Sequence, residues 1–589
     1  MMMMKTILAC AALWVGTVQA ADVGATERLH QLFKQTWEQD LAANPLEASY
    51  AGERRYNALL PDLSPAAIKA RQQANHATLK ALSSIPAASL PTDEQLNYTL
   101  FKDKIEDRIA AEPFKLWLDV IGPRGGPQTG SEWAEVMPFE TAADYQNWLA
   151  RLEALPHYME QVQALMRQAM AEHRTPPRVL MARVQSQLRK QLGAQAEASP
   201  FYKRFKPGSY PASIPAAEQT RITARATTLI EGHIVPAFSR FEQFFSAEFL
   251  PACRESVGAW DLPDGAAFYA NRVQHYTTTS LTPEQIHEIG LKEVARIEGE
   301  MNTLMAQLGY SGRREEFFTK LRTDPQFFFK DPQELFAAYV LKAKQIEPEL
   351  PKLFGKLYRT PFGVRAIPDI LAPDTYTAYY SPGSLDGRRA GYYYVNLYRP
   401  EVRPKWEIEV LTSHESVPGH HLQTALAQEL GELPMFRRYA GYTAFVEGWG
   451  LYAERLGYEI GLYKDPYSHF GQLSYDMWRA VRLVIDTGIH LKHWSRQQAI
   501  DYFMAKAPKA EADIVQEVDR YISWPGQALG YKIGQLKILE LRARAEKALG
   551  AKFDLRAFHD MLLSAGALPL DVLEQRVDAW IAANKSAKM

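Results

Sequence analysis

Cysteine is almost absent from this chain, with two residues in 589. Cys10 lies in an apolar N-terminal segment, and Cys253 would be the only thiol left once that segment is removed. The sequence therefore predicts no intrachain disulfide in the mature protein, so its stability must come from a large packed core. No residue near Cys253 is typical of a base that activates a thiol, which favours a buried and inert side chain.

The chain also lacks an excess of charge of either sign, because 67 Lys and Arg residues oppose 68 Asp and Glu. This balance excludes the basic field typical of proteins that bind nucleic acid or anionic membranes. After the N-terminal segment, the apolar runs are all too short to span a bilayer. No repeat, low-complexity tract or long linker divides the chain, and its composition is that of an ordinary globular protein. The oligomeric state is left open.

The N-terminal segment has the features of an export signal. Lys5 precedes an apolar stretch from Ile7 to Val18, and small residues follow up to Ala20. This pattern predicts a signal peptide cleaved after Ala20 and a protein that is periplasmic or secreted. One alternative is a buried N-terminal helix. Another is lipid attachment at Cys10, which ranks lower because it leaves too short a hydrophobic region.

Most of the remaining chain has the periodicity of amphipathic helices, with proline and glycine between the segments. Thr282-Pro283-Glu284-Gln285 has the N-cap, first-turn proline and capping box of a helix start, and predicts a helix to about Leu308. Further helices are predicted at 26–43, 64–83, 94–111, 142–172 and 214–248.

Strand signals concentrate between residues 376 and 397. Segments 376–380 and 391–397 are rich in Tyr and Val and flank a loop with proline and glycine, which predicts an antiparallel hairpin. In a strand, Tyr392, Tyr394 and Asn396 would share one face. They could belong to an aromatic strand packed on helices. They could also belong to an edge strand beside a cleft, where they would contact an extended peptide substrate.

The strongest chemical signal is residues 414–421, which read His-Glu-Ser-Val-Pro-Gly-His-His. Zinc peptidases use a His-Glu pair followed closely by another histidine to place two imidazoles and a general base around one metal. In a regular helix over 405–417, however, the residue one turn after His414 would be Pro418, which cannot bind a metal. His420 would point away, and His421 would lie roughly 10 Å further along the axis.

Pro418 and Gly419 remove this obstacle, because proline interrupts the helical hydrogen bonds and glycine tolerates unusual backbone geometry. They predict a break or bulge that returns a histidine to the metal. The residues themselves leave both His420 and His421 open as the second ligand.

A third ligand is predicted on another helix, at Glu447 in the segment 445–454. Glu454 lies two turns further on and would accept a hydrogen bond from a ligand imidazole. Two histidines and one glutamate leave a position for water, which is the arrangement of a catalytic site with one zinc ion per chain. Glu415 would be the general base. A His-Glu pair can be surface decoration, but three of the fourteen histidines within eight residues favour the metal site.

These residues resemble a bacterial family of exported proteins catalogued as domain of unknown function 885. The marks of that family are the block at 414–421 and the Glu-Gly-Trp segment at 447–449. Further matches span nearly all of the mature chain, at 281–284, 392–397, 482–490 and 525–531. The family in turn looks like a distant relative of helical zinc peptidases such as thermostable carboxypeptidases, thimet oligopeptidases and angiotensin-converting enzyme.

The resemblance has implications for individual residues. The zinc peptidases have His-Glu-x-Gly-His, so aligning their Gly-His with Gly419-His420 implies His420 as the second ligand and a two-residue insertion, with His421 as the alternate. They also carry a tyrosine late in the chain, which suggests Tyr531 as an oxyanion donor.

A predicted helix over 476–494 offers two more candidates. His490 shares a face with Asp486 and Arg482, and could stabilise the transition state or belong to a structural ladder of ion pairs. Arg479 or Arg482 could hold a substrate carboxylate with two hydrogen bonds.

Together these features predict a mainly α-helical, zincin-like catalytic unit with a small antiparallel sheet beside a deep cleft. Residues 21–270 would form a helical wall or lid, and 271–589 the metal-binding part of the same compact unit. The expected function is zinc-dependent hydrolysis of short peptides, of oligopeptidase or carboxypeptidase type. The rivals are a metal-dependent hydrolase of a non-peptide amide or ester, and a catalytically silent protein that binds zinc or peptide.

Overall fold

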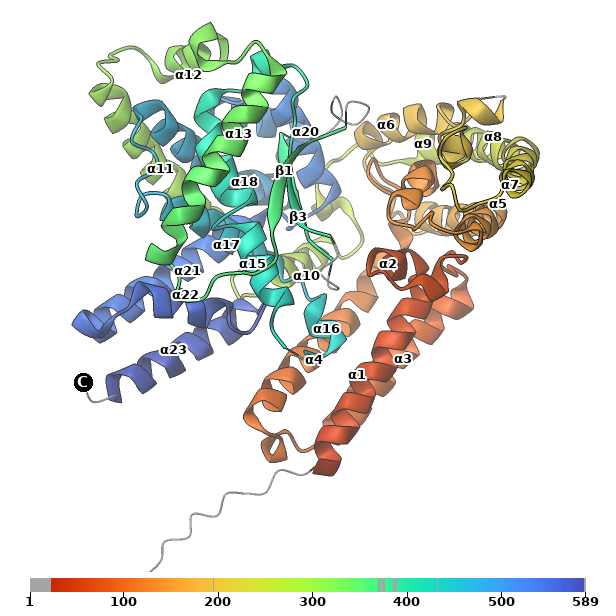
Figure 1. The fold of residues 1–589 in the computed structure, drawn as a ribbon, viewed down its shortest axis with the longest axis horizontal. Coiled ribbons are helices and arrows are strands. Elements are labelled where there is room, and N and C mark those ends of the chain that lie inside the picture. The colour runs from red at the N-terminus through yellow and green to blue at the C-terminus, as the bar shows by residue number, and fades with distance from the viewer. Residues whose placement is uncertain are drawn as a thin grey trace, which may run out of the picture.

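The structure is a computed structural model that describes residues 23–193, 195–368, 372, 377–384, 389–431 and 433–586. The proposed signal segment, with Cys10 and Ala20, lies outside the described residues. The fold is mainly helical with one small sheet, as the sequence predicted. In Figure 1 a group of N-terminal helices lies below a second helical lobe, and the larger body beside them carries the sheet.

The helices predicted from periodicity are present. They are α1 (Val23–Ala43), α3 (Pro65–Ser83), α4 (Thr92–Ala111), α5 (Ala142–Ala171) and α11 (Pro283–Gln307). At the start of α11, Thr282 and Gln285 form the predicted capping box. The segment 214–248 is less regular than predicted, because π-helical turns at Ile230–Ile234 and Phe245–Phe249 interrupt α7 (Ala216–Leu229) and α8 (Val235–Phe244).

The helix predicted over 476–494 is α18 (Pro466–His490), which begins ahead of the predicted start behind an Asp465 cap. The other helices are α2 (Pro45–Tyr50), α6 (Arg178–Arg189), α9 (Leu250–Ala252), α10 (Gly265–Thr277), α12 (Arg314–Thr323), α13 (Pro332–Ile346), α14 (Ile408–Glu415), α15 (His420–Gln428), α16 (Met435–Arg438), α17 (Thr443–Leu456), α19 (Arg496–Lys506), α20 (Glu511–Ser523), α21 (Leu529–Leu549), α22 (Leu555–Leu563) and α23 (Leu570–Ser586).

The sheet contains β1 (Phe362–Ala366), β2 (Ala378–Ser381) and β3 (Gly391–Val395), in the order β1-β3-β2. The predicted hairpin is confirmed, since β2 and β3 are antiparallel with Tyr379 opposite Tyr394. The expectation of a purely antiparallel sheet is wrong, because β1 pairs with β3 in parallel. β1 was not predicted from the sequence, because it is short, contains a glycine and has no fully buried residue. β3 is therefore the central strand, and its backbone cannot bind a peptide as an edge strand would.

Two main hydrophobic cores hold the molecule together. The first unites α5 to α8 with α18, α19 and α20, and the second unites α1 and α4 with α17, α21 and α23. Each core contains residues from both sides of position 270. Cys253 is buried in the first core, and burial raises the pKa of its thiol to about 12, as expected for an inert cysteine.

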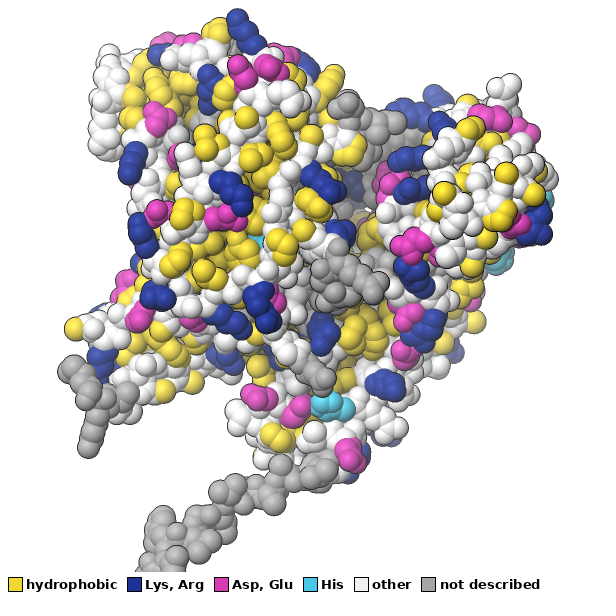
Figure 2. Space-filling model, in the orientation of Figure 1, with side chains coloured by type: hydrophobic (Ala, Val, Ile, Leu, Met, Phe, Trp, Pro, Cys, Tyr) yellow, Lys and Arg dark blue, Asp and Glu magenta, His cyan; other side chains and the backbone are white. Residues whose placement is uncertain are grey.

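The surface is balanced in charge, and Figure 2 shows acidic and basic side chains interspersed over one face of the molecule. In the part of the chain that the structure describes, none of the helices has the length and apolar character needed to cross a membrane.

The close contact between α17 and α21 in the second core depends on glycine. On α17 and α21, Gly448 and Gly534 face one another, and a Cβ on Gly534 would lie 1.8 Å from the carbonyl oxygen of Ala444. A Cβ on Gly448 would lie 2.5 Å from the backbone of Gly534. Only glycine allows these two backbones to approach so closely, and α17 carries the predicted metal ligand Glu447.

We expect Gly534→Ala to lower the free energy of unfolding by about 3 kcal/mol, because the added methyl group forces the helices apart. Gly299→Ala is the matched control. Gly299 is an exposed helical glycine with open space around it, so alanine there should raise stability by about 0.5–1 kcal/mol. Denaturant titration measures both effects, and equal midpoints for Gly534→Ala and the unmodified protein would contradict the packing argument.

Candidate metal centre

The helix break that the sequence predicted lies between α14 and α15. α14 ends at Glu415 and α15 begins at His420, with the turn Ser416–Gly419 between them. Gly419 has a φ of −77°, and a Cβ there would lie 1.9 Å from the carbonyl oxygen of His414. Glycine is therefore needed for space rather than for a left-handed backbone. The Pro418 carbonyl accepts a hydrogen bond of 2.9 Å from Trp449 Nε1, which fixes the turn against α17.

The break brings together the side chains of His414, His420 and Glu447. Glu447 Oε2 lies 3.6 Å from His414 Nε2 and 3.5 Å from His420 Nε2. Within the described residues these three offer one ligand atom each, all within 4.8 Å of one another. Two imidazole nitrogens and one carboxylate oxygen that face a common point fit the donor set of a catalytic zinc ion.

A second carboxylate orients the first imidazole. Glu454 is fully buried, and its Oε1 accepts a hydrogen bond of 2.9 Å from His414 Nδ1, which directs Nε2 toward Glu447. Arg479 Nη2 lies 3.2 Å from the same oxygen. Gly450 makes room for the imidazole, since a Cβ there would lie 2.7 Å from His414 Cε1. Such an outer partner fixes the tautomer and orientation of a metal-binding histidine.

The electrostatics of the centre favour a bound cation. Burial lowers the pKa of His414, but hydrogen bonds to Glu447 and Glu454 and the nearby charge of Glu415 raise it to about 9. Burial raises the pKa of Glu447, yet His414 and His420 hold it well below its ordinary value. The carboxylates thus stabilise positive charge at the point where the imidazoles meet.

His421 is directed elsewhere, which answers the question that the sequence left open. Its Nε2 donates to the Thr360 carbonyl at 3.1 Å, and its Nδ1 lies 3.0 Å from the Tyr380 hydroxyl. The ring packs against Tyr358 and Phe362, and burial lowers its pKa to about 4. The geometry therefore places His420, and not His421, beside His414.

The two proposed catalytic groups lie near this cluster. Glu415 is half-buried and follows His414 directly at the end of α14. Tyr531 lies in the first turn of α21, and its pKa is raised by burial and by the negative charge of Glu447. The Gly448–Gly534 contact explains why Tyr531 lies near Glu447. Gly448 directly follows Glu447 on α17, and Gly534 is within one turn of Tyr531 on α21. This role of glycine was not predicted from the sequence, although the Glu-Gly-Trp-Gly spacing at 447–450 is a signal of close packing.

His490 does not join the cluster, and the structure corrects its suggested catalytic role. Its Nδ1 accepts from the Ala259 amide at 3.0 Å, and its Nε2 donates to the Tyr521 carbonyl at 2.9 Å. Burial lowers its pKa to about 3, so this neutral ring is held by the backbone and has no donor to spare. The alternative of an ion-pair ladder is also wrong. Asp486 accepts from Tyr269 and from the Gly526 amide instead.

The three residues in and next to β3 that were predicted to contact a substrate differ in their surroundings. Tyr392 and Tyr394 do share a face of β3, with ring centroids 6.1 Å apart, and both are partly exposed. Asn396 is buried, donates to the Ala372 carbonyl at 2.8 Å and accepts from the Tyr398 amide. Its proposed contact with substrate is therefore corrected to a structural role.

Those tyrosines are themselves engaged by neighbouring strands. The Arg365 guanidinium lies 3.5 Å from the Tyr392 ring centroid and donates to its hydroxyl, and Tyr379 stacks on Tyr394 at 4.9 Å. Contact of Tyr392 or Tyr394 with a substrate stays a prediction.

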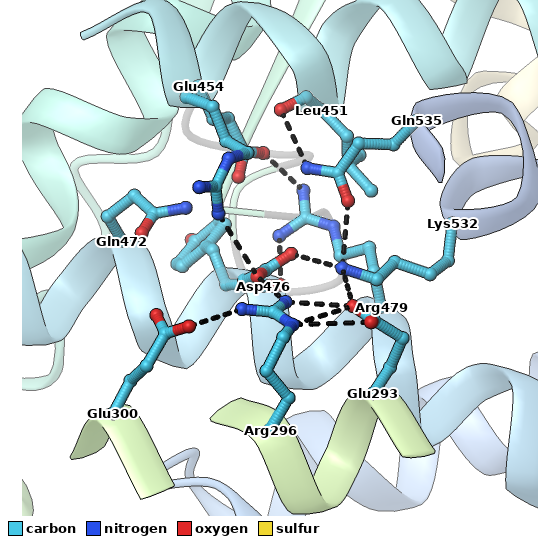
Figure 3. A network of polar contacts seen from close by, with 12 residues as sticks. Glu293, Arg296, Glu300, Leu451, Glu454, Gln472, Asp476, Arg479, Lys532 and Gln535 are labelled. Atoms are coloured by element: carbon cyan, nitrogen blue, oxygen red, sulfur yellow. Dashed lines mark hydrogen bonds and ion pairs between the residues drawn. The ribbon is translucent and has the colours of Figure 1, made fainter. Parts of the chain in front are cut away.

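A buried polar network supports the helix that carries Glu447 and Glu454 (Figure 3). Asp476 of α18 lies 2.6 Å from Lys532 Nζ of α21 and 2.9 Å from Arg296 Nη2 of α11. Burial opposes the ionisation of Asp476, but these two cations hold its pKa far below the ordinary value. Gln535 of α21 donates to the Leu451 carbonyl of α17 at 3.1 Å. Four helices are thus held in register behind the metal centre.

A cavity of about 870 Å³ lies elsewhere, between α1, α2, α4, α10 and α16. Its walls include Trp37, Asp103, His275 and Tyr439, and it reaches Thr443 at the start of α17. None of the three clustered ligand side chains lines it, so its size says nothing about access to the metal centre.

Comparison with known proteins places this fold among bacterial proteins without an assigned activity. Residues 45–577 match the model of a family described as "Bacterial protein of unknown function (DUF885)". No curated protein matches the chain.

Two solved structures are similar to this one. The first is described as a "putative lipoprotein" from Colwellia psychrerythraea. It is 29% identical with a TM-score of 0.88, and the match covers 95% of this chain and 99% of that one. The second is a "putative lipoprotein of unknown function" from Shewanella oneidensis. It is 19% identical with a TM-score of 0.72 and coverage of 93% and 99%, and it supports the fold alone.

We expect His414→Ala, His420→Ala and Glu447→Ala to lose bound zinc after dialysis, because each removes one of three converging donor atoms. His421→Ala should retain zinc despite some loss of stability, since its ring faces Thr360 and Tyr380. Elemental analysis of the purified proteins measures the content. Zinc retained by His420→Ala but lost from His421→Ala would reverse this assignment.

Proposed function

Because the chain belongs to the DUF885 family of bacterial proteins of unknown function, we propose its activity from the geometry of the centre at His414, His420 and Glu447. The proposal is a zinc-dependent metallopeptidase that hydrolyses short peptides. The observation that carries it is the convergence of these three donor atoms, with Glu415 directly after the first ligand.

A bound zinc ion would supply a Lewis acid that lowers the pKa of a water molecule. The chain supplies the three ligands, and Glu454 holds His414 in the tautomer that keeps Nε2 available to the metal. Burial of His414 and Glu454 excludes competing water from this side of the centre. We include in this proposal that the fold is zincin-like and that a deep cleft leads to the metal centre.

Glu415 is the proposed general base. Its carboxylate takes a proton from the attacking water and passes it to the nitrogen of the leaving amine. Tyr531 is the proposed donor to the carbonyl oxygen, on which negative charge develops during attack. The raised pKa of Tyr531 keeps the phenol protonated at neutral pH, as a donor must be.

We also propose that the protein is exported. The 29% identical structure is described as a putative lipoprotein, so lipid attachment at Cys10 no longer ranks below cleavage after Ala20. This revises the order of alternatives drawn from the sequence, in which the short hydrophobic region counted against a lipid anchor.

We expect Glu415→Gln to retain zinc and lose about 10²- to 10⁴-fold in kcat on short peptides, because the amide cannot accept the proton of water. Glu401→Gln is the control, since Glu401 is an exposed glutamate and should leave both quantities unchanged. A library of peptides with free and blocked termini, tested beside simple amides and esters, measures turnover. Zinc-loaded protein that cleaves no peptide would refute the peptidase proposal.

We expect Tyr531→Phe to lower kcat by about 10²- to 10³-fold with little change in zinc content, because only the hydroxyl donor is lost. Burial of the ring is retained, so the melting temperature should stay close to that of the unmodified protein. An unchanged kcat in this variant would exclude Tyr531 as the oxyanion donor.

A further inference from the structure

Arg482 of α18 has a buried hydrogen-bond donor without a partner. Its side chain is 5% exposed, its Nε donates to the Tyr521 hydroxyl at 3.0 Å, and its Nη2 donates to Glu517 at 3.0 Å. Its Nη1 is buried and has no hydrogen-bond partner within the described part of the chain. A buried guanidinium N–H without an acceptor is costly, and this one leaves Arg482 able to donate one more hydrogen bond.

Arg482 shares its carboxylate partner with a second guanidinium. The same oxygen of Glu517 lies 3.1 Å from Arg520 Nη2 and accepts from the Tyr521 hydroxyl at 2.7 Å. Burial raises the pKa of Glu517, but Arg520 and Arg482 lower it to about 2, so this carboxylate stays ionised. Glu517 thus binds Arg482 through Nη2 only, and within the described residues Nη1 remains without an acceptor.

Arg482 lies next to the residues of the metal centre. Its guanidinium carbon is 4.3 Å from the ring centroid of Tyr531 and 5.0 Å from that of Trp478. The guanidinium of Arg479 lies 4.9 Å from the same Trp478 ring and also contacts Glu454, the partner of His414. Arg482 therefore contacts the proposed oxyanion donor, and it shares the Trp478 ring with Arg479, which contacts the outer partner of the first ligand.

We propose that Arg482 binds a carboxylate of the substrate, so that the preferred substrates are short peptides with a carboxylate close to the scissile bond. A guanidinium suits this role because its N–H groups match a carboxylate in two hydrogen bonds. Tyr531 is partly exposed and covers the guanidinium, so the carboxylate enters beside this ring. The carboxylate is either the C-terminus of the peptide or an acidic side chain. This inference rests on the proposed peptidase function.

The first test compares three N-blocked peptides of equal length: one ending in a free carboxylate, its C-terminal amide, and an amide whose last residue is glutamate. The free acid should be cleaved with a kcat/KM roughly 10- to 100-fold above that of its amide, the range of one charged hydrogen-bonded contact. Recovery of the rate by the glutamate amide would identify a side-chain carboxylate as a second source. Equal kcat/KM for all three peptides would overturn the inference but leave the peptidase proposal intact.

Variants of Arg482 then test whether this residue causes the preference for a carboxylate. Arg482→Gln should lose the preference for the carboxylate while retaining zinc, and Arg482→Lys should retain part of it because the charge remains. Arg496→Gln is the control, because Arg496 pairs with Asp519 and lies outside the proposed site. A carboxylate preference that survives in Arg482→Gln would contradict the assignment.

A binding measurement keeps the test independent of turnover. Calorimetry with N-acetylphenylalanine and N-acetylphenylalaninamide on the zinc-loaded protein should show tighter binding of the acid, lost in Arg482→Gln. If no peptide is cleaved, this difference still supports the carboxylate site. Equal affinities for the acid and the amide in the unmodified protein would refute the site.

Discussion

The approach of α17 to its two neighbours is the constraint on which the rest of the centre depends. Gly448 lets α17 contact the backbone of α21 at Gly534, and Gly450 leaves room for the imidazole of His414. Glu447 directly precedes Gly448 on the same helix. These two contacts therefore hold its carboxylate near both histidines and near Tyr531. A side chain at either glycine would displace a ligand from its partners.

The cost of burying charge beside the centre is offset by networks of partners. Asp476, Lys532 and Arg296 are neutralised together at the junction of α11, α18 and α21. Glu454 is fully buried but contacts both His414 and Arg479. Removing one member of such a group leaves an uncompensated charge, so these contacts fix the geometry of the helices more than they add stability. Within the described residues, Arg482 Nη1, Arg479 Nε and Glu454 Oε2 are buried without a hydrogen-bond partner, so the polar groups beside the centre are not all satisfied.

The break after Glu415 has two consequences for the centre. It turns His420 back toward His414, and it places His421 on the opposite side, against Tyr358 and Phe362 near β1. His420 and His421, which are adjacent at the start of α15, therefore have different roles. His420 lies in the cluster with His414 and Glu447, and His421 joins the helix to the segment that precedes the sheet.

The sequence by itself determined the features that depend on neighbouring residues. The capping box at Thr282, the β2–β3 hairpin and the break at Pro418-Gly419 could be predicted, because local backbone preferences and hydrogen bonds within a few residues decide them. The residue types of the centre could also be predicted, since two His and one Glu are one of the donor sets that hold a catalytic zinc ion.

Only the tertiary structure decided which side chains meet. The choice of His420 over His421 depends on Thr360 and Tyr380, and the structural role of His490 depends on backbone groups at Ala259 and Tyr521. These partners lie 31 to 231 positions away along the chain. Periodicity within one helix carries no information about them, because packing between distant segments determines whether a polar side chain is left free to act.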